Sequence, residues 1–124
     1  MFDSLRTMGA MASLMKNKDQ LRAAAERVKE SLASLRVTGE AGGGAVRVTA
    51  SGRFEVVRVE IAPAVAAALS GDGARAQVEA LIAEATNDAL RRAQERAREV
   101  MSREAEAMGV PELSGVLGQA LGGA

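Results

Sequence analysis

The chain has 124 residues, a length typical of one domain, with 16 basic and 16 acidic side chains that cancel to a net charge of zero. The absence of cysteine and histidine excludes disulfides and thiolate chemistry, and it removes the commonest general base and metal ligand. Zero net charge also excludes a strongly basic nucleic-acid binder, so any DNA contact must come from local clusters.

No apolar run approaches the roughly 20 residues of a membrane span, and the first residues lack a signal-peptide pattern. We therefore expect a soluble cytoplasmic protein. Alanine supplies 26 of the 59 apolar residues. Because alanine buries little area, at about 25 cal/mol per Å² buried, one chain alone would form a thin core. A helix-rich protein that gains core by self-association is favoured.

Residues 3–35 are predicted to form one long helix. Its apolar positions follow the alternating spacing of four and three residues that is typical of a coiled-coil seam. The seam either packs against the chain's own second helix or forms a dimer contact, and the two alternatives are compatible. The seam positions are Leu14, Leu21, Ala25, Val28, Leu32 and Leu35.

Residues 36–61 lose this helical period and are predicted to form a small antiparallel sheet. The segment 36–41 is a short first strand, and Val46, Val48 and Ala50 alternate with polar residues in a second. A third strand follows the turn at Gly52, with Val57, Val59 and Ile61 on one face. The sheet should have one apolar and one charged face, and Pro63 ends it.

The stretch VTGEAGGGAVR at 37–47 is either a phosphate-binding loop or a hairpin turn. Gly39 and Gly44 have P-loop spacing, but Ala45 and Val46 stand where that motif requires Lys and Ser or Thr. A P-loop also leads into a helix, whereas this loop leads into a strand. A hairpin turn, in which glycine supplies positive φ without strain, is favoured.

A short helical stretch at 63–69 precedes a second long helix at 74–108, with Asp72 as a plausible N-cap. Gly109 and Pro111 end that helix. The expected organisation is one α-β-α domain over residues 1–108 and a mobile glycine-rich tail over 109–124.

The two long helices lead to the expectation of a homodimer. At 1.5 Å per residue each would span about 50 Å, whereas a domain of this length has a radius of gyration near 14 Å. Both helices must therefore project, and their apolar seams need a partner. The candidate dimer interface comprises Leu21, Val28, Leu32, Val46, Val48, Val57, Val59 and Ile61.

Basic residues on the long helices are the candidates for DNA contact. Spacings of four and seven place several on common helix faces that could follow phosphates. The alternative is a solvated helix face with ion pairs. Base stacking is disfavoured because the chain has two Phe and no Trp or Tyr. The candidates are Lys16, Lys18, Arg22, Lys29, Arg91, Arg92, Arg96 and Arg98.

The carboxylates Glu55, Glu60, Asp88, Glu95 and Glu99 could in principle serve acid–base or metal chemistry. Each has an arginine nearby in sequence, so solvated ion pairs are the favoured interpretation. We expect no enzyme activity, no cofactor, no metal and no small-molecule substrate.

Three stretches resemble the YbaB/EbfC family of bacterial nucleoid-associated proteins: LMKNKDQL at 14–21, VTGEAGGGAVRVTASGRFEVVRVEIAP at 37–63 and ATNDALRRAQE at 85–95. The resemblance covers about residues 2–108. It implies an α-β-α subunit in a tweezer-like homodimer that binds duplex DNA with low sequence specificity in the nucleoid. It implies no cofactor and no catalytic residue.

The sequence thus predicts a dimeric α+β nucleoid-associated DNA-binding protein, with weak and salt-sensitive binding because the net charge is zero. The alternative is a dimeric scaffold or adaptor that binds another protein.

Overall fold

The structure, a computed structural model, describes residues 2–71 and 73–108, with side chains from residue 17 onward. Its order of helix, three-stranded antiparallel sheet and long helix confirms the predicted α+β fold. The elements are α1 (Phe2–Ser34), β1 (Arg36–Ala41), β2 (Val46–Ser51), β3 (Val56–Ile61), α2 (Pro63–Ala67), the 3-10 turn η1 (Ala68–Ser70) and α3 (Ala74–Ala107).

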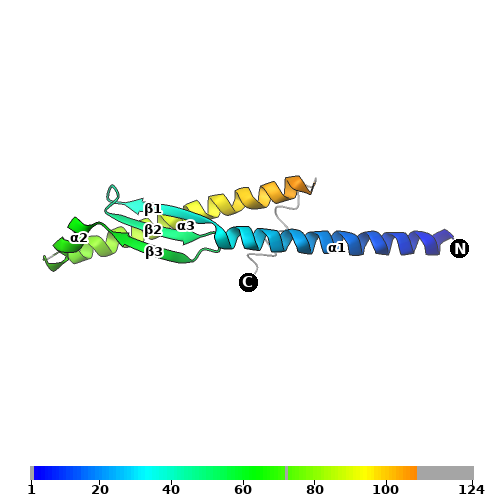
Figure 1. The fold of residues 1–124 in the computed structure, drawn as a ribbon, viewed down its shortest axis with the longest axis horizontal. Coiled ribbons are helices and arrows are strands. Elements are labelled where there is room, and N and C mark those ends of the chain that lie inside the picture. The colour runs from blue at the N-terminus through cyan, green and yellow to red at the C-terminus, as the bar shows by residue number, and fades with distance from the viewer. Residues whose placement is uncertain (1, 72, 109–124) are drawn as a thin grey trace.

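The molecule is elongated because both long helices extend past the sheet (Figure 1). The first part of α3 lies against the sheet and its second part continues beyond it. Helix α1 leaves the same end of the sheet and reaches further, with the N-terminus at its far tip (Figure 1). Helix α1 and the second half of α3 project past the sheet as expected, whereas the first half of α3 packs against the sheet (Figure 1).

The three strands form a meander in the order β1-β2-β3. Antiparallel pairing sets Gly39 opposite Val48 and Val48 opposite Val59. The loop between β1 and β2 contains Gly42, Gly43 and Gly44, all at positive φ. This geometry favours glycine because other residues meet a steric penalty there, and it confirms the hairpin-turn interpretation.

One face of β1 and β2 packs on α3 and forms the main core. Val46, Val48 and Ala50 of β2 are fully buried against Ala85 and Ala89 of α3. Alanines at every fourth position keep that side of α3 narrow, so the helix lies directly on the backbone of β1 at Gly39. The alanine-rich composition therefore gives a close approach of helix to sheet.

A second, smaller core joins α1 to α3. Val28 and Leu32 of α1 pack with Ala97 of α3, all three being buried. The backbone N–H of Gly52, in the turn between β2 and β3, donates to the carbonyl oxygen of Leu32 at 2.9 Å. This bond satisfies a carbonyl in the last turn of α1 and anchors the helix to the sheet. The seam of α1 thus packs on the chain's own second helix over this stretch.

Helix α3 has Gly73 at its N-cap position, with φ of 82° and no side-chain capping bond. Asp72, the N-cap suggested by the sequence, lies outside the described residues, and so does the tail at 109–124.

Candidate nucleic-acid interface

The candidate basic residues of α1 form one exposed row. Lys18, Arg22 and Lys29 are all exposed, and at 100° per residue they fall within an arc of about 40°. The row lies about 140–180° around the helix from Arg27, which reaches across to α3. It therefore faces away from that contact. The side chain of Lys16 is outside the described part of the chain.

On α3 the candidate arginines form two rows. Arg91 and Arg98 are seven residues apart, Arg92 and Arg96 are four apart, and the two rows are about 100–160° apart around the helix. All four side chains are exposed. No single face of α3 presents all four arginines.

Carboxylates accompany several of these cations. Arg91 and Arg92 both pair with Asp88, at 3.3 Å and 3.2 Å. Arg96 pairs with Glu99, and Lys29 lies 3.7 Å from Glu26. Exposed pairs of this kind contribute little to stability, but each reduces the local positive potential.

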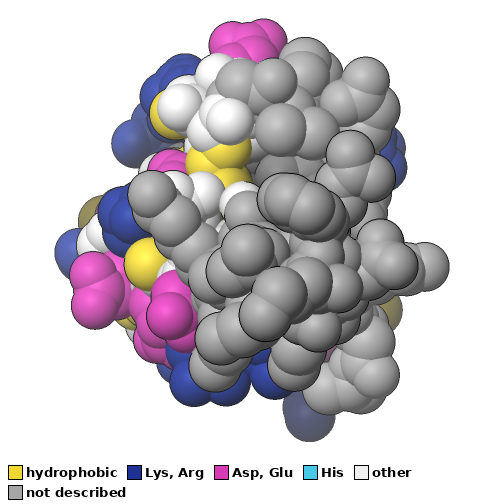
Figure 2. All heavy atoms as spheres, turned by 90° about the vertical axis from the view of Figure 1, so that its right-hand side faces the viewer, with side chains coloured by type: hydrophobic (Ala, Val, Ile, Leu, Met, Phe, Trp, Pro, Cys, Tyr) yellow, Lys and Arg dark blue, Asp and Glu magenta, His cyan; other side chains and the backbone are white. Residues whose placement is uncertain are grey.

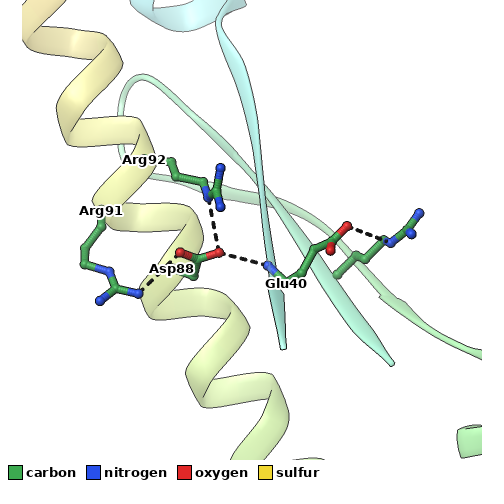
Figure 3. Close-up of polar contacts among 5 residues, drawn as sticks. Glu40, Asp88, Arg91 and Arg92 are labelled. Carbon is green, nitrogen blue, oxygen red and sulfur yellow. Dashed lines mark hydrogen bonds and ion pairs between the residues drawn. The ribbon is translucent and has the colours of Figure 1, made fainter. Parts of the chain in front are cut away.

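Asp88 differs from the other carboxylates because it is fixed in place (Figure 3). Its Oδ2 accepts a hydrogen bond from the backbone N–H of Glu40 at 3.1 Å, in addition to the contact with Arg92. The Asp88 side chain is 21% exposed. The bond from Glu40 is the largest influence that lowers the pKa of Asp88; Arg92 and Arg91 lower it further, and partial burial opposes them.

A fixed negative charge therefore lies beside two of the four candidate arginines on α3. Within the described side chains, by contrast, Lys18, Arg22 and Arg98 form no ion pair with a carboxylate. Among the predicted cations whose side chains are described, these three are the most available.

The end of the molecule toward which the helices project carries both signs of charge. Figure 2 shows lysine and arginine side chains interspersed with aspartate and glutamate over the described surface in that view. This mixture agrees with the zero net charge. A DNA contact must accordingly use particular rows of side chains.

The candidate carboxylates mostly contact arginines. Glu60 pairs with Arg58 at 3.2 Å, and Glu99 contacts Arg96 and Arg103. Within the described residues, no three acidic side chains gather in a way that could hold a metal ion. None of the described helices is long and apolar enough to cross a membrane.

The candidate dimer residues separate into two groups. Val28, Leu32, Val46 and Val48 are buried inside a single chain, where they contact α3 or the sheet. Leu21 and Ile61 are partly buried, whereas Val57 and Val59 are 52% and 45% exposed. The exposed members thus lie on β3.

The two edges of the sheet differ. At the open side of β1, the N–H of Glu40 is bonded to Asp88 of α3. Strand β3 is the opposite edge, and α3 lies over β1 and β2 but not over β3. Val56, Val57 and Val59 of β3 are consequently exposed. An uncovered, valine-rich edge is an interaction site that proteins normally shield.

Sequence reasoning did not identify the Asp88–Glu40 contact or the closeness of Gly39 to α3. The second had a signal, because glycine inside a strand often marks a close approach of another backbone. The first had none, since the two residues are 48 positions apart.

Comparison with known proteins agrees with this geometry. The model of the YbaB/EbfC DNA-binding family matches residues 8–108. Among solved structures, the chain is similar to the crystal structure of uncharacterized protein HP0035 from Helicobacter pylori, at 20% sequence identity and a TM-score of 0.59. The match covers 72% of this chain and 89% of the other, and it concerns the fold.

Proposed function

The chain belongs to the YbaB/EbfC DNA-binding family, and we propose that it is a nucleoid-associated protein of the bacterial cytoplasm that binds duplex DNA as a homodimer with low sequence specificity. The observation that carries the proposal is the exposed row of Lys18, Arg22 and Lys29 on a projecting helix, together with the family membership. Rows of cations at helical spacing suit phosphates, which carry no base information.

The contact set proposed on α1 is Lys16, Lys18, Arg22 and Lys29, and on α3 it is Arg91, Arg92, Arg96 and Arg98. Lys18, Arg22 and Arg98 contribute most because their charge is not offset by a neighbouring carboxylate among the described side chains. Three such cations per chain make six in a dimer. Six phosphate contacts correspond to a slope of log affinity against log salt of roughly −5.

The dimer forms through β3 in this proposal, by the valines that the single chain leaves exposed. Burial of Val57 and Val59 in a dimer removes apolar area from water. The projecting helices of the two subunits then form a tweezer-like pair of arms. Val59→Lys tests this interface: a charge on an exposed strand should leave the subunit folded but make it sediment as a monomer.

The DNA-binding test is a salt titration of duplex affinity for the wild type, Arg22→Ala and Arg98→Ala. Each variant removes two contacts per dimer, so the slope should become less steep by roughly 2. Arg75→Ala is the matched control, because Arg75 is exposed and lies at the other end of α3, in its first turn. Absence of duplex binding by the wild type at low salt would refute the proposal. A nuclease-resistant protein partner would instead support an adaptor.

A further inference from the structure

The register of the dimer can be derived from β3 itself, and the inference rests on the proposed homodimer. In two antiparallel strands, pairs of directly opposite residues alternate between hydrogen-bonded and non-hydrogen-bonded pairs. The N–H of Ala62 donates to the carbonyl of Ala45, so Glu60 and Arg58, at steps of two along β3, are the residues bonded to β2. The backbone groups of Val59 and Ile61 therefore point to the open edge. Val57 has no partner in β2, because the register shifts between Thr49 and Ala50 and interrupts the alternation there.

The two faces of β3 carry different chemistry. Val59 and Ile61 are paired with Val48 and Val46, so they share the face that packs on α3. Arg58 and Glu60 lie on the opposite face, where they form an ion pair with each other at 3.2 Å. A two-fold axis perpendicular to the sheet makes two β3 strands antiparallel and keeps both apolar faces on the same side.

That symmetry restricts the register to a few choices. Residues directly opposite each other in the two β3 strands must have their side chains on the same face of the sheet. The two-fold axis therefore passes beside one residue of β3, which is opposite its own copy. An axis through Arg58 would set it opposite its own copy, and an axis through Glu60 would do the same for two carboxylates. Like charges directly opposite are destabilising. An axis through Val57 would fall on the residue that the β2–β3 register skips, and it would set Arg58 opposite the partner's Val56, without an ionic contact. An axis through Val59 sets Arg58 opposite the partner's Glu60, and by symmetry it sets Glu60 opposite the partner's Arg58.

We propose that two copies of β3 pair in the register centred on Val59, with Arg58 of each chain facing Glu60 of the other. The register centred on Val59 also continues two cross-strand rows of side chains that are already present in the sheet. Glu40 is opposite Arg47, with an ion pair at 3.0 Å, and Arg47 is opposite Glu60. The partner's Arg58 extends this row of alternating charge, and Val57 meets the partner's Ile61.

Cross-linking tests the register because the chain contains no cysteine. In the proposed pairing the two Val59 Cα atoms lie about 5.5 Å apart, a separation that a disulfide can span. Oxidised Val59→Cys should run as a covalent dimer, whereas Val57→Cys, Arg58→Cys and Glu60→Cys should not. Efficient cross-linking of any of these three, in place of Val59→Cys, identifies another register and overturns the proposal.

Charge reversal provides a second readout that does not depend on oxidation. Arg58→Glu and Glu60→Arg each replace two attractive pairs by two repulsive ones, so each homodimer should weaken about tenfold or more. A mixture of the two variants should recover dimers, because both cross-strand pairs of the mixed dimer again join a carboxylate to a guanidinium. The matched controls are the single variants Arg103→Glu and Glu106→Arg, which make the same charge changes on the projecting part of α3 and are measured alone and as a mixture.

The outcomes separate the register from the dimer. A wild type that sediments as a monomer contradicts the proposed homodimer as a whole. A wild-type dimer in which Val59→Cys does not cross-link, or in which the mixture does not recover, overturns the register and leaves the dimer standing. DNA affinity is measured separately, so its loss bears on neither conclusion. Circular dichroism of each variant establishes that the subunit is folded.

Discussion

Gly39 of β1 and Ala89 of α3 are in contact backbone to backbone. A Cβ atom added to Gly39 would lie 2.2 Å from the nitrogen of Ala89 and 2.5 Å from the carbonyl oxygen of Ala85. No side chain fits between strand and helix at this point. The close approach allows α3 to bury the core face of β1 and β2 with small residues.

Gly39→Ala should therefore destabilise the protein by about 2–3 kcal/mol, because one added methyl group must push α3 away from the sheet. Urea unfolding followed by circular dichroism measures the change. Gly71→Ala is the control, since Gly71 has φ of −83° and its nearest neighbour would be 3.4 Å from the new Cβ. The control should change stability by less than about 0.5 kcal/mol. Equal effects of the two substitutions would contradict the close-packing explanation.

The ion cluster at Asp88 predicts a pH-dependent contribution to stability. The pKa of Asp88 is lowered from 3.8 in the folded state, so the charged form is stabilised by folding. This stability is fully present above pH 3.8 and is lost as the pH falls through the lower, folded pKa. Asp88→Asn should cost about 1 kcal/mol at neutral pH, since the carboxylate is partly exposed and solvent screens its pairs.

Urea unfolding of both proteins, in steps from neutral pH to well below 3.8, checks this prediction. The curves should converge at the acid end, because the wild-type carboxyl is then neutral as well. Asp88→Ala, which also removes the acceptor for the N–H of Glu40, should remain less stable than wild type at every pH. A constant difference between wild type and Asp88→Asn would show that the charge is not the cause.

The same aspartate should weaken DNA binding. Its negative charge lies 3.3 Å from Arg91 and 3.2 Å from Arg92, and its bond to Glu40 prevents it from moving away. Removal of the charge in Asp88→Asn should raise duplex affinity a few-fold at low salt and steepen the salt dependence. Fluorescence anisotropy with one labelled duplex measures both effects.

Glu79→Gln provides the control, because Glu79 pairs with Arg75 near the start of α3, away from the proposed contact rows. It makes the same change in net charge, so it should leave affinity nearly unchanged. Unchanged affinity in Asp88→Asn, measured where the variant is fully folded, would place Arg91 and Arg92 outside the DNA contact.

Much of this fold could be predicted from the sequence, because the period of apolar residues reports which face is buried. The alternation of Val46, Val48 and Ala50 identified β2, and the structure buries all three. The same alternation at Val57 and Val59 identified β3 as a strand. It did not reveal that α3 lies over β1 and β2 but not over β3, because a period specifies a face and not the element that covers it.

The candidate site shows the same limit. Spacing placed Arg91 and Arg92 on α3 and Lys18 and Arg22 on α1, and all four side chains are exposed as expected. Spacing could not show that Asp88 is fixed beside the first two, since its anchor is a backbone amide on a distant strand. Local sequence identifies helix rows, whereas the tertiary contact decides which cations keep their charge available.

An ion pair between Arg27 of α1 and Glu104 of α3 joins the two long helices. Arg27 Nε donates to Glu104 Oε1 at 2.8 Å, and Nη2 of the same guanidinium contacts the same oxygen. The side chains are 57% and 20% exposed. A double-mutant cycle with Arg27→Ala and Glu104→Ala should give a coupling energy of about 0.5–1 kcal/mol in low salt, and less in high salt because exposed charges are screened.

The matched cycle uses Arg75→Ala and Glu79→Ala, a pair within one helix at 2.9 Å. Its coupling should be about 0.3–0.5 kcal/mol, smaller than that of the bridge between helices, because Arg75 and Glu79 are 83% and 63% exposed. The comparison distinguishes an ion pair that holds two helices together from one that lies on the surface of a single helix. Coupling at Arg27 and Glu104 no larger than in the control cycle would mean that the buried contacts of Val28, Leu32 and Ala97 alone hold α1 on α3.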